Sequence, residues 1–234
     1  MPEYVFPHCQ KQEGEIEKIK GISRLYAYPC KPCFENESKI VILDSGAYGL
    51  SKAKIKMSDS YMKKLSEHYL KYYCDNTLCI APDEFLNPIQ SMQNIRKWFK
   101  KGLFGSVTAV LQASKKNEIN LDDLKYQAEF YRQYTDTICF SNNNLRGMQA
   151  QNFKLNIIFD FCKKLEYKWI HVLGAGFSIR DICDWFDIGN FDSMDSIAYY
   201  TTKNKEEFGS LNAVENIKEI MKHVSKYQDN SFVK

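Results

Sequence analysis

The sequence lacks several features that would place the protein at a membrane. No apolar run approaches the roughly 20 residues of a membrane-spanning helix. The first residues, MPEYVFPHCQKQEGE, also lack the basic and then apolar order of a secretion signal. A net charge of +3 is too small to predict a nucleic-acid-binding protein by itself. We therefore expect a cytoplasmic protein with no membrane partner, and 234 residues are enough for one domain with a sizeable core.

Metal ligands are also scarce. Cys30 and Cys33, in YPCKPC, have the spacing of zinc ligands, but no second pair accompanies them. Other cysteines, such as Cys79, Cys139 and Cys162, lie within apolar patterns, which indicates buried, reduced thiols. We expect no metal ion, and a site at Cys30 and Cys33 remains the alternative.

Eight short apolar runs predict β-strands, and amphipathic patterns between them predict α-helices. The predicted strands cover residues 4–6, 25–28, 40–43, 78–81, 107–111, 137–140, 169–173 and 191–195. The predicted helices cover residues 58–72, 89–100, 121–134, 153–165 and 214–224, the first of them capped by Ser58. From residue 40 onward, strand and helix alternate.

Strands that are apolar along their whole length and alternate with helices indicate a parallel sheet buried on both faces. A (β/α)8 barrel and an open doubly wound sheet both have this pattern, and we expect the barrel. The segment from Pro29 to Ser38 is too short for a crossover helix, so the start should be irregular. The predicted single domain, residues 1–234, has its irregular part at 1–38, its polar motifs at 39–200 and a C-terminal helix within 201–234.

Polar or glycine residues follow most of these runs, at the point where each strand ends. They are Asp44, Asp83, Gln112, Asn142, Gly174, Gly176 and Asp195. Each could simply form a turn, since Asp, Asn and Gly are common turn residues. The carboxyl ends of parallel strands share one rim, however, so these residues would converge on one pocket. His171, within its strand, is instead expected to be a core residue with satisfied hydrogen bonds.

Three carboxylates and an amide on one rim could divide the steps of a displacement at a sugar carbon. Carboxylates that flank a glycosidic bond act as nucleophile and as proton shuttle. A third carboxylate can accept hydrogen bonds from N1 and N2 of a guanine, and the Gln112 amide can donate one to O6. The rim therefore suits a purine glycoside.

Five motifs occur in a fixed order between residues 40 and 200: DSGAYG, APDEF, VLQ, HVLGAG and FDSMDS. Together they resemble the tRNA-guanine transglycosylase superfamily, which includes relatives that place 7-deazaguanines in DNA. The resemblance implies a barrel enzyme that exchanges guanine in a polynucleotide, DNA or RNA, for a free 7-deazaguanine base. It also implies a double displacement through a covalent aspartyl intermediate, with no cofactor.

The resemblance implies which residues carry out this exchange. Asp195 in FDSMDS would be the nucleophile that attacks C1′, and Asp192 competes with it for this role. Asp44 in DSGAYG would be the general acid/base, and Tyr48 would stack on the base. Asp83 in APDEF would accept from the N1 and N2 groups of the base.

Four further residues would complete the base pocket. By the same resemblance, Gln112 would donate to O6, and Gly174 and Gly176 would let the backbone approach the substrate closely. The segment from Ser141 to Asn144 replaces a glycine-rich stretch of the family, so the amide of Asn142 would substitute for a backbone donor to O6.

One departure from the family concerns the polymer that is modified. The last cysteine, Cys183, precedes Asp195, so the zinc module that tRNA enzymes carry after the nucleophile is missing. This and the lack of room for an RNA-binding extension favour a DNA-modifying relative. Two alternatives stay open: a glycosylase that releases the base to water, and a non-catalytic module that binds a purine.

Overall fold

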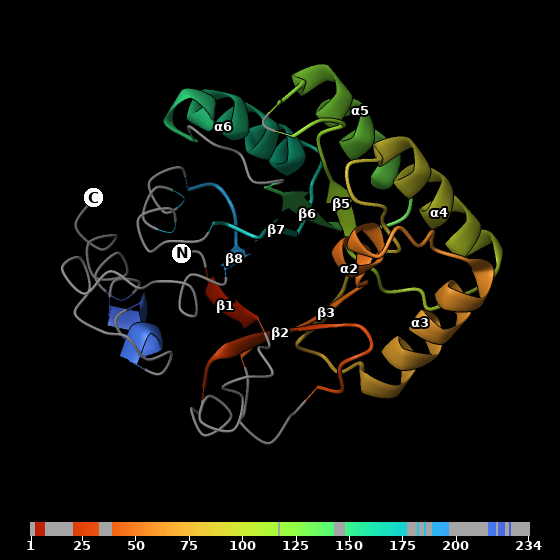
Figure 1. Ribbon diagram of the computed structural model, residues 1–234. Helices are drawn as coiled ribbons and strands as arrows, with labels where there is room; N and C mark the ends of the chain where they lie inside the picture. The colour runs from red at the N-terminus through yellow and green to blue at the C-terminus, as the bar shows by residue number, and fades with distance from the viewer. Residues whose placement is uncertain are drawn as a thin grey trace.

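The described part of the chain contains one eight-stranded sheet with helices around it (Figure 1). The computed structural model describes residues 3–7, 21–32, 39–116, 118–142, 148–176, 182, 185, 189–196, 215–218, 220–222 and 225, with the backbone alone for 148–153. The strands are β1 (Glu3–Pro7), β2 (Ser23–Ala27), β3 (Val41–Asp44), β4 (Thr77–Cys79), β5 (Ala109–Leu111), β6 (Thr137–Ser141), β7 (Trp169–Leu173) and β8 (Ser193–Asp195). All eight predicted strands are therefore confirmed.

The sheet is parallel throughout and curls so that β1 and β8, the first and last strands along the sequence, pair with each other. Its order is β4-β3-β2-β1-β8-β7-β6-β5, in which all sequence neighbours except β4 and β5 are paired, and β1 also pairs with β8. Between β4 and β5, the described residues form one isolated bridge, from Ile80 to Thr108, in place of a ladder. Two backbone hydrogen bonds accompany this bridge, from Thr108 to Cys79 and from Ala81 to Thr108. The α/β class and the parallel sheet are confirmed, but the sheet is not a closed barrel, because the two three-residue edge strands are too short to form a full ladder.

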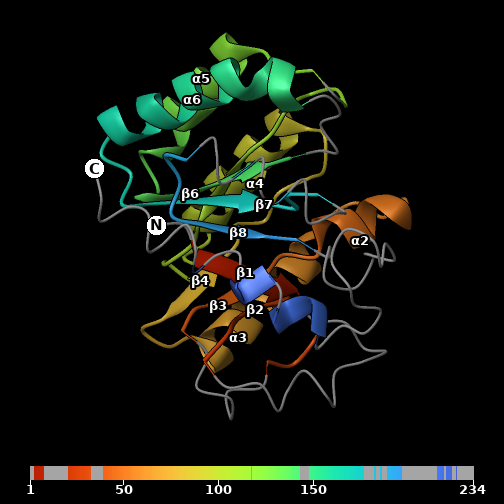
Figure 2. The same ribbon diagram turned by 90° about the vertical axis from the view of Figure 1, so that its left-hand side faces the viewer.

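Five helices follow the strands from β3 onward. They are α2 (Ala47–Lys52), α3 (Asp59–Tyr72), α4 (Pro88–Lys100), α5 (Leu121–Tyr131) and α6 (Met148–Lys164). The Ser58 side chain accepts a hydrogen bond from the Tyr61 amide and caps α3, as predicted. The short α2 was not predicted, and Figure 2 shows it apart from the helices that cover the sheet. At the C-terminus, residues 215–218, 220–222 and 225 are helical, which confirms the last predicted helix, 214–224, over 215–218 and 220–222.

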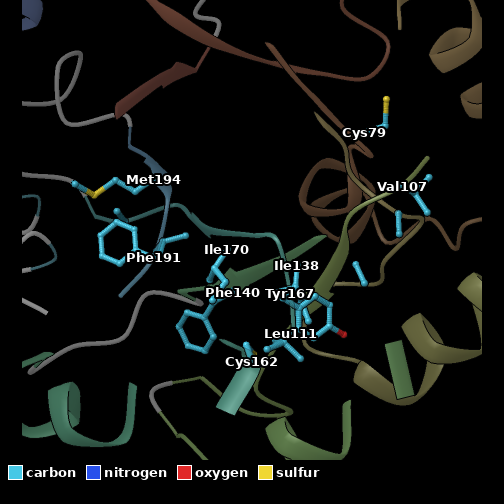
Figure 3. Close-up of a cluster of buried hydrophobic side chains, with 14 of the residues drawn as sticks. Cys79, Val107, Leu111, Ile138, Phe140, Cys162, Tyr167, Ile170, Phe191 and Met194 are labelled. Atoms are coloured by element: carbon cyan, nitrogen blue, oxygen red, sulfur yellow. The ribbon is translucent and has the colours of Figure 1, made fainter. Parts of the chain in front are cut away.

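Side chains of successive strand residues enter two separate apolar clusters. The larger one lies between the sheet and the helices, and Figure 3 shows part of it, where Ile138, Phe140 and Ile170 face Cys162. The smaller one lies on the inner face of the curl and consists of Val5, Leu25, Ile42, Ile80, Val110 and Cys139. Because both faces of the strands are buried, the strands read as continuous apolar runs in the sequence. No helix within the described ranges is long and apolar enough to cross a membrane.

Candidate active site

Three aspartates meet at the carboxyl ends of the strands. Asp44 is the last residue of β3, Asp195 is the last residue of β8, and Asp83 follows β4. Asp44 lies two residues after Ile42, so the alternation of a strand places both on the inner face of the curl. Asp83 and Asp195 are both near enough for their negative charges to raise the pKa of Asp44, so the three carboxyl groups lie in the same region of this rim. The structure thus brings together the carboxylates that the sequence predicted to converge.

A tight turn after β3 orders the region between two of these carboxyl groups. Gly46 has a φ of 79°, in the left-handed region, and a Cβ atom there would lie 2.8 Å from the Tyr61 hydroxyl. The Tyr61 hydroxyl donates to the Ser45 carbonyl at 2.7 Å, and the Ser45 hydroxyl donates to Asp83 Oδ1 at 2.6 Å. Glycine is therefore required at this turn, which links Asp44 to Asp83 through Ser45.

Burial changes the protonation of two of the aspartates. It raises the pKa of Asp44 from its ordinary value of 3.8 to about 7, and the negative charges of Asp83 and Asp195 add to this effect. Burial likewise raises the pKa of Asp83 to about 6, against the opposing hydrogen bond from Ser45. At neutral pH, Asp44 can therefore both donate and accept a proton, which is what a general acid/base requires.

Asp195 has two hydrogen-bond partners at its Oδ1 atom. His171 Nε2 lies 3.0 Å from its Oδ1 atom, and the Gly174 amide donates to the same oxygen at 3.1 Å. The residue is 6% exposed. Asp192, the competing residue, lies before β8 and accepts a hydrogen bond from the Ile170 amide at 2.8 Å. It is thus at the amino end of the strand, away from Asp44.

Gln112 is buried and uses its side chain within the protein. Its Oε1 atom accepts from the Leu86 amide at 2.7 Å, and its Nε2 atom donates to the Ser91 hydroxyl at 2.8 Å. Its backbone is paired with the side chain of Gln127. The bonds to Leu86 and Ser91 connect the end of β5 to the loop before α4 and to α4 itself, beside the one bridge between β4 and β5, and the bonds to Gln127 connect it to α5. Donation from Gln112 to a base stays a prediction.

Tyr48 lies on α2 and contacts Phe85, two residues after Asp83. Its ring is 49% exposed and packs edge-on against Phe85, with ring centroids 5.2 Å apart. Lys52 Nζ lies 4.6 Å from the centre of the Tyr48 ring. A hollow of about 230 Å³ beside α2 is lined by Asp83, Phe85 and the exposed Lys54 and Lys56, among others. An aromatic ring and cations therefore lie close to Asp83, whereas Asp44 and Asp195 do not line this hollow.

The remaining predicted residues lie at the ends of β6 and β7. The Asn142 side chain donates to the Gly174 carbonyl at 2.8 Å, while its buried Oδ1 atom has no hydrogen-bond partner in the described ranges. Gly174 and Gly176 have φ values of 65° and 140°, which favour glycine. Asn142 thus offers an acceptor near Gly174, whereas the sequence prediction assigned it a donor. Asn143 and Asn144, the next residues along, lie outside the described residues.

The sequence interpretation missed the connection of His171 to the site. The histidine is buried with both ring nitrogens paired, as expected for a core residue, but one partner is Asp195. The available signal was its position, one strand away from Asp195 and on the same inner face. Within the described residues, no three His, Cys, Asp or Glu side chains are arranged to hold a metal ion. Cys30 is partly buried, and Cys33 lies outside the described residues.

A second hollow, of about 410 Å³, lies at the opposite end of the sheet. Its lining includes Thr77, Thr108, Arg132 and Thr137, and none of the predicted site residues.

No protein-family model matches the sequence, and no curated protein matches it significantly. The resemblance to the transglycosylases therefore depends on the five sequence motifs.

Proposed function

We propose that the protein is a base-exchange transglycosylase that replaces guanine by a 7-deazaguanine in a polynucleotide. The observation that carries the proposal is the grouping of Asp44, Asp83 and Asp195 at one end of the parallel sheet, with the pKa of Asp44 at about 7. A nucleophile, a proton shuttle and a base acceptor are the three groups that such an exchange needs. A fold of the (β/α)8 type, left open between β4 and β5, is part of the same proposal.

The proposed reaction has two displacements at C1′ of the sugar. Asp195 attacks C1′, the bond to N9 of guanine breaks, and Asp44 protonates the departing base at N9. The incoming 7-deazaguanine then loses its N9 proton to Asp44 and attacks C1′, which releases Asp195. One glycosidic bond is broken and one is formed, so the exchange needs no cofactor. Asp44 begins each cycle protonated, which its raised pKa supports.

The base would lie between Tyr48 and the three carboxyl groups. Asp83 would accept from N1 and N2 of the base, and its carboxyl group is already oriented by Ser45. Tyr48 would stack on the exposed face of the base, and the backbone at Gly174 and Gly176 would approach it from the side of β7. In the proposed pocket, Asn142 supplies an acceptor and Gln112 a donor for the polar edge of the base.

The lysines near Asp83 favour a polyanion over a free nucleoside. Lys54 and Lys56 are exposed in the lining of the hollow that contains Asp83, and Lys52 is exposed on the neighbouring α2. Lysines placed in this way can bind successive phosphates. A base within a duplex cannot reach a buried carboxylate, so the target nucleotide must be unpaired or flipped out. We put DNA before tRNA because residues 196–234 contain no cysteine for the zinc module that the tRNA enzymes of the superfamily carry after the nucleophile.

The test is the exchange of a labelled base. The protein is incubated with radiolabelled guanine and, separately, with DNA or tRNA, and the label in each polymer is counted. Covalent complexes are trapped and resolved on a denaturing gel. The proposal expects label in DNA and a trapped complex, and no exchange into either polymer would refute it. Release of guanine with no incorporation would instead favour the base-releasing glycosylase.

A matched pair of variants tests the assignment of the nucleophile. Asp195→Asn keeps an oxygen that can accept from His171 and Gly174, so the fold should be retained while the trapped complex disappears. Asp192→Asn keeps an acceptor for the Ile170 amide and should leave the trapped complex intact. Incorporation of the label by the Asp195→Asn variant would show that this assignment is wrong.

A further inference from the structure

A chain of hydrogen-bonded polar groups leads from Trp169, at the amino end of β7, to Asp195. Trp169 Nε1 donates to the Ser193 hydroxyl at 2.9 Å, and this hydroxyl lies 2.7 Å from His171 Nδ1. On the other side of the ring, His171 Nε2 lies 3.0 Å from Asp195 Oδ1. All four residues belong to the neighbouring strands β7 and β8, and His171 and Ser193 are in register. The connection is thus built into the pairing of two strands.

The order of donors in this chain determines where the proton of His171 lies. The indole of Trp169 can only donate, so the Ser193 oxygen accepts a hydrogen bond from it, and the hydrogen of the Ser193 hydroxyl remains to be donated to another partner. The one further partner of that hydroxyl in the described ranges is His171 Nδ1, which therefore accepts. The ring then carries its hydrogen on Nε2 and donates it to Asp195. An imidazolium would donate from both nitrogens and would leave the Ser193 hydrogen without this acceptor.

Two donors bind the same oxygen of the aspartate. His171 Nε2 and the Gly174 amide both approach Asp195 Oδ1, while Asp195 Oδ2 has no hydrogen bond within the described residues. Donors that replace lost hydration are required where an ionised carboxylate is buried. A carboxylate held in this way has one oxygen committed to the protein and the other available to a ligand.

We propose that His171 is the positioning residue of Asp195. Held by Ser193 and Trp169 as the neutral Nε2–H tautomer, it fixes Oδ1 and presents Oδ2 as the atom that attacks C1′. The inference depends on the proposed function, because it assigns a role in the same displacement. His171 does not itself reach the substrate, since its ring is fully buried and both nitrogens are in use. The structure therefore separates the nucleophile from the group that orients it.

The first experiment compares two substitutions of the histidine. His171→Leu removes the donor and keeps much of the volume, whereas His171→Gln keeps an N–H donor near the position of Nε2. At saturating DNA, the rate of covalent complex formation should fall by about 100-fold in His171→Leu, because a nucleophile misplaced by about 1 Å loses that much. His171→Gln should recover most of the rate. The dissociation constant of free guanine should change little in either variant, whereas general damage to the site would weaken it.

The second experiment observes the tautomer directly and does not depend on turnover. In ¹⁵N NMR spectra of histidine-labelled protein, the resonances of His171, identified by their loss in His171→Gln, should show a protonated Nε2 and an unprotonated Nδ1. Ser193→Ala removes the donor to Nδ1 and should lessen this preference; it also serves if His171→Leu does not fold. A protonated Nδ1 in the wild type would overturn the inference.

The outcomes separate this inference from the function on which it depends. If the wild type forms no covalent complex with any polymer, the proposed function fails. If the wild type forms the complex and His171→Leu forms it at the same rate, the proposed function stands and the role of His171 is refuted.

Discussion

Replacement of Asp44 by asparagine should make the protein more stable at neutral and alkaline pH. The folded state raises the pKa of this carboxyl group from 3.8 to about 7, chiefly by burial. Below pH 4 the group is protonated in both the folded and the unfolded chain, and it contributes no pH dependence. As the pH rises from about 4 to about 7, the unfolded chain releases the proton first, and the folded state loses stability. Above about pH 7 the loss is complete.

The expected change in the free energy of unfolding follows from the size of the shift in the pKa of Asp44. About three pKa units at about 1.4 kcal/mol each give an upper value of ~4 kcal/mol. Asp83 titrates in the same range, with a pKa of about 6, and its negative charge accounts for part of the raised pKa of Asp44. We therefore expect the difference in the free energy of unfolding between Asp44→Asn and the wild type to grow by ~2–4 kcal/mol from about pH 4 to about pH 8.

Urea unfolding at a series of pH values measures this difference. The change with pH is the informative quantity, because a constant offset only reports how well asparagine packs. Asp59→Asn is a control for which the pH dependence of the stability difference should have the opposite sign. Hydrogen bonds from Lys101 and Lys97 lower the pKa of Asp59, so its replacement should reduce the stability at neutral pH and have less effect in acid. If the curves of Asp44→Asn and the wild type run parallel, Asp44 does not titrate near neutrality and the argument for a proton shuttle is refuted.

Two further variants test the architecture around the site. Gly46→Ala should lower the free energy of unfolding by ~1–3 kcal/mol in urea titrations, because φ is 79° and the added Cβ would meet Tyr61 and Tyr28. Gly102→Ala, with a φ of 60° and open space around the added Cβ, measures the cost of the left-handed backbone alone, so an equal loss in both variants would contradict the steric argument. Gln112→Met should lower the free energy of unfolding by ~1–3 kcal/mol, because it leaves the Leu86 amide unpaired. Gln93 is exposed, so Gln93→Met should change this free energy little, and equal stability of the two variants would show that the Gln112 hydrogen bonds contribute nothing.

The strands could be predicted from the sequence because both of their faces are buried. Ile42 faces the inside of the curl and Leu43 the helices, so the run around them is apolar at every position. The short α2 could not be predicted, since its six residues include Gly49 and no full apolar stripe. The helix depends on its place after the Gly46 turn more than on its own sequence.

The site was predictable in outline and not in its connections. The grouping of Asp44, Asp83 and Asp195 follows from the rule that parallel strands end on one side. The choice between Asp192 and Asp195 depends on where β8 begins, and a spacing of three residues does not contain this information. The link from His171 to Asp195 depends on the register between β7 and β8, which no local pattern encodes.

The single bridge between β4 and β5 also has a consequence for how the pocket admits a ligand. Asp83 and Gln112 lie just beyond the two strands that meet there, so this junction forms one wall of the pocket. Parting it breaks two backbone hydrogen bonds, from Thr108 and Ala81, together with the bonds of the Gln112 side chain. Transient opening of this wall would enlarge the pocket without unpairing any full ladder of the sheet. Amide hydrogen exchange at Ala81 and Thr108 would report how often this junction opens, and a bound base should slow the exchange of both amides.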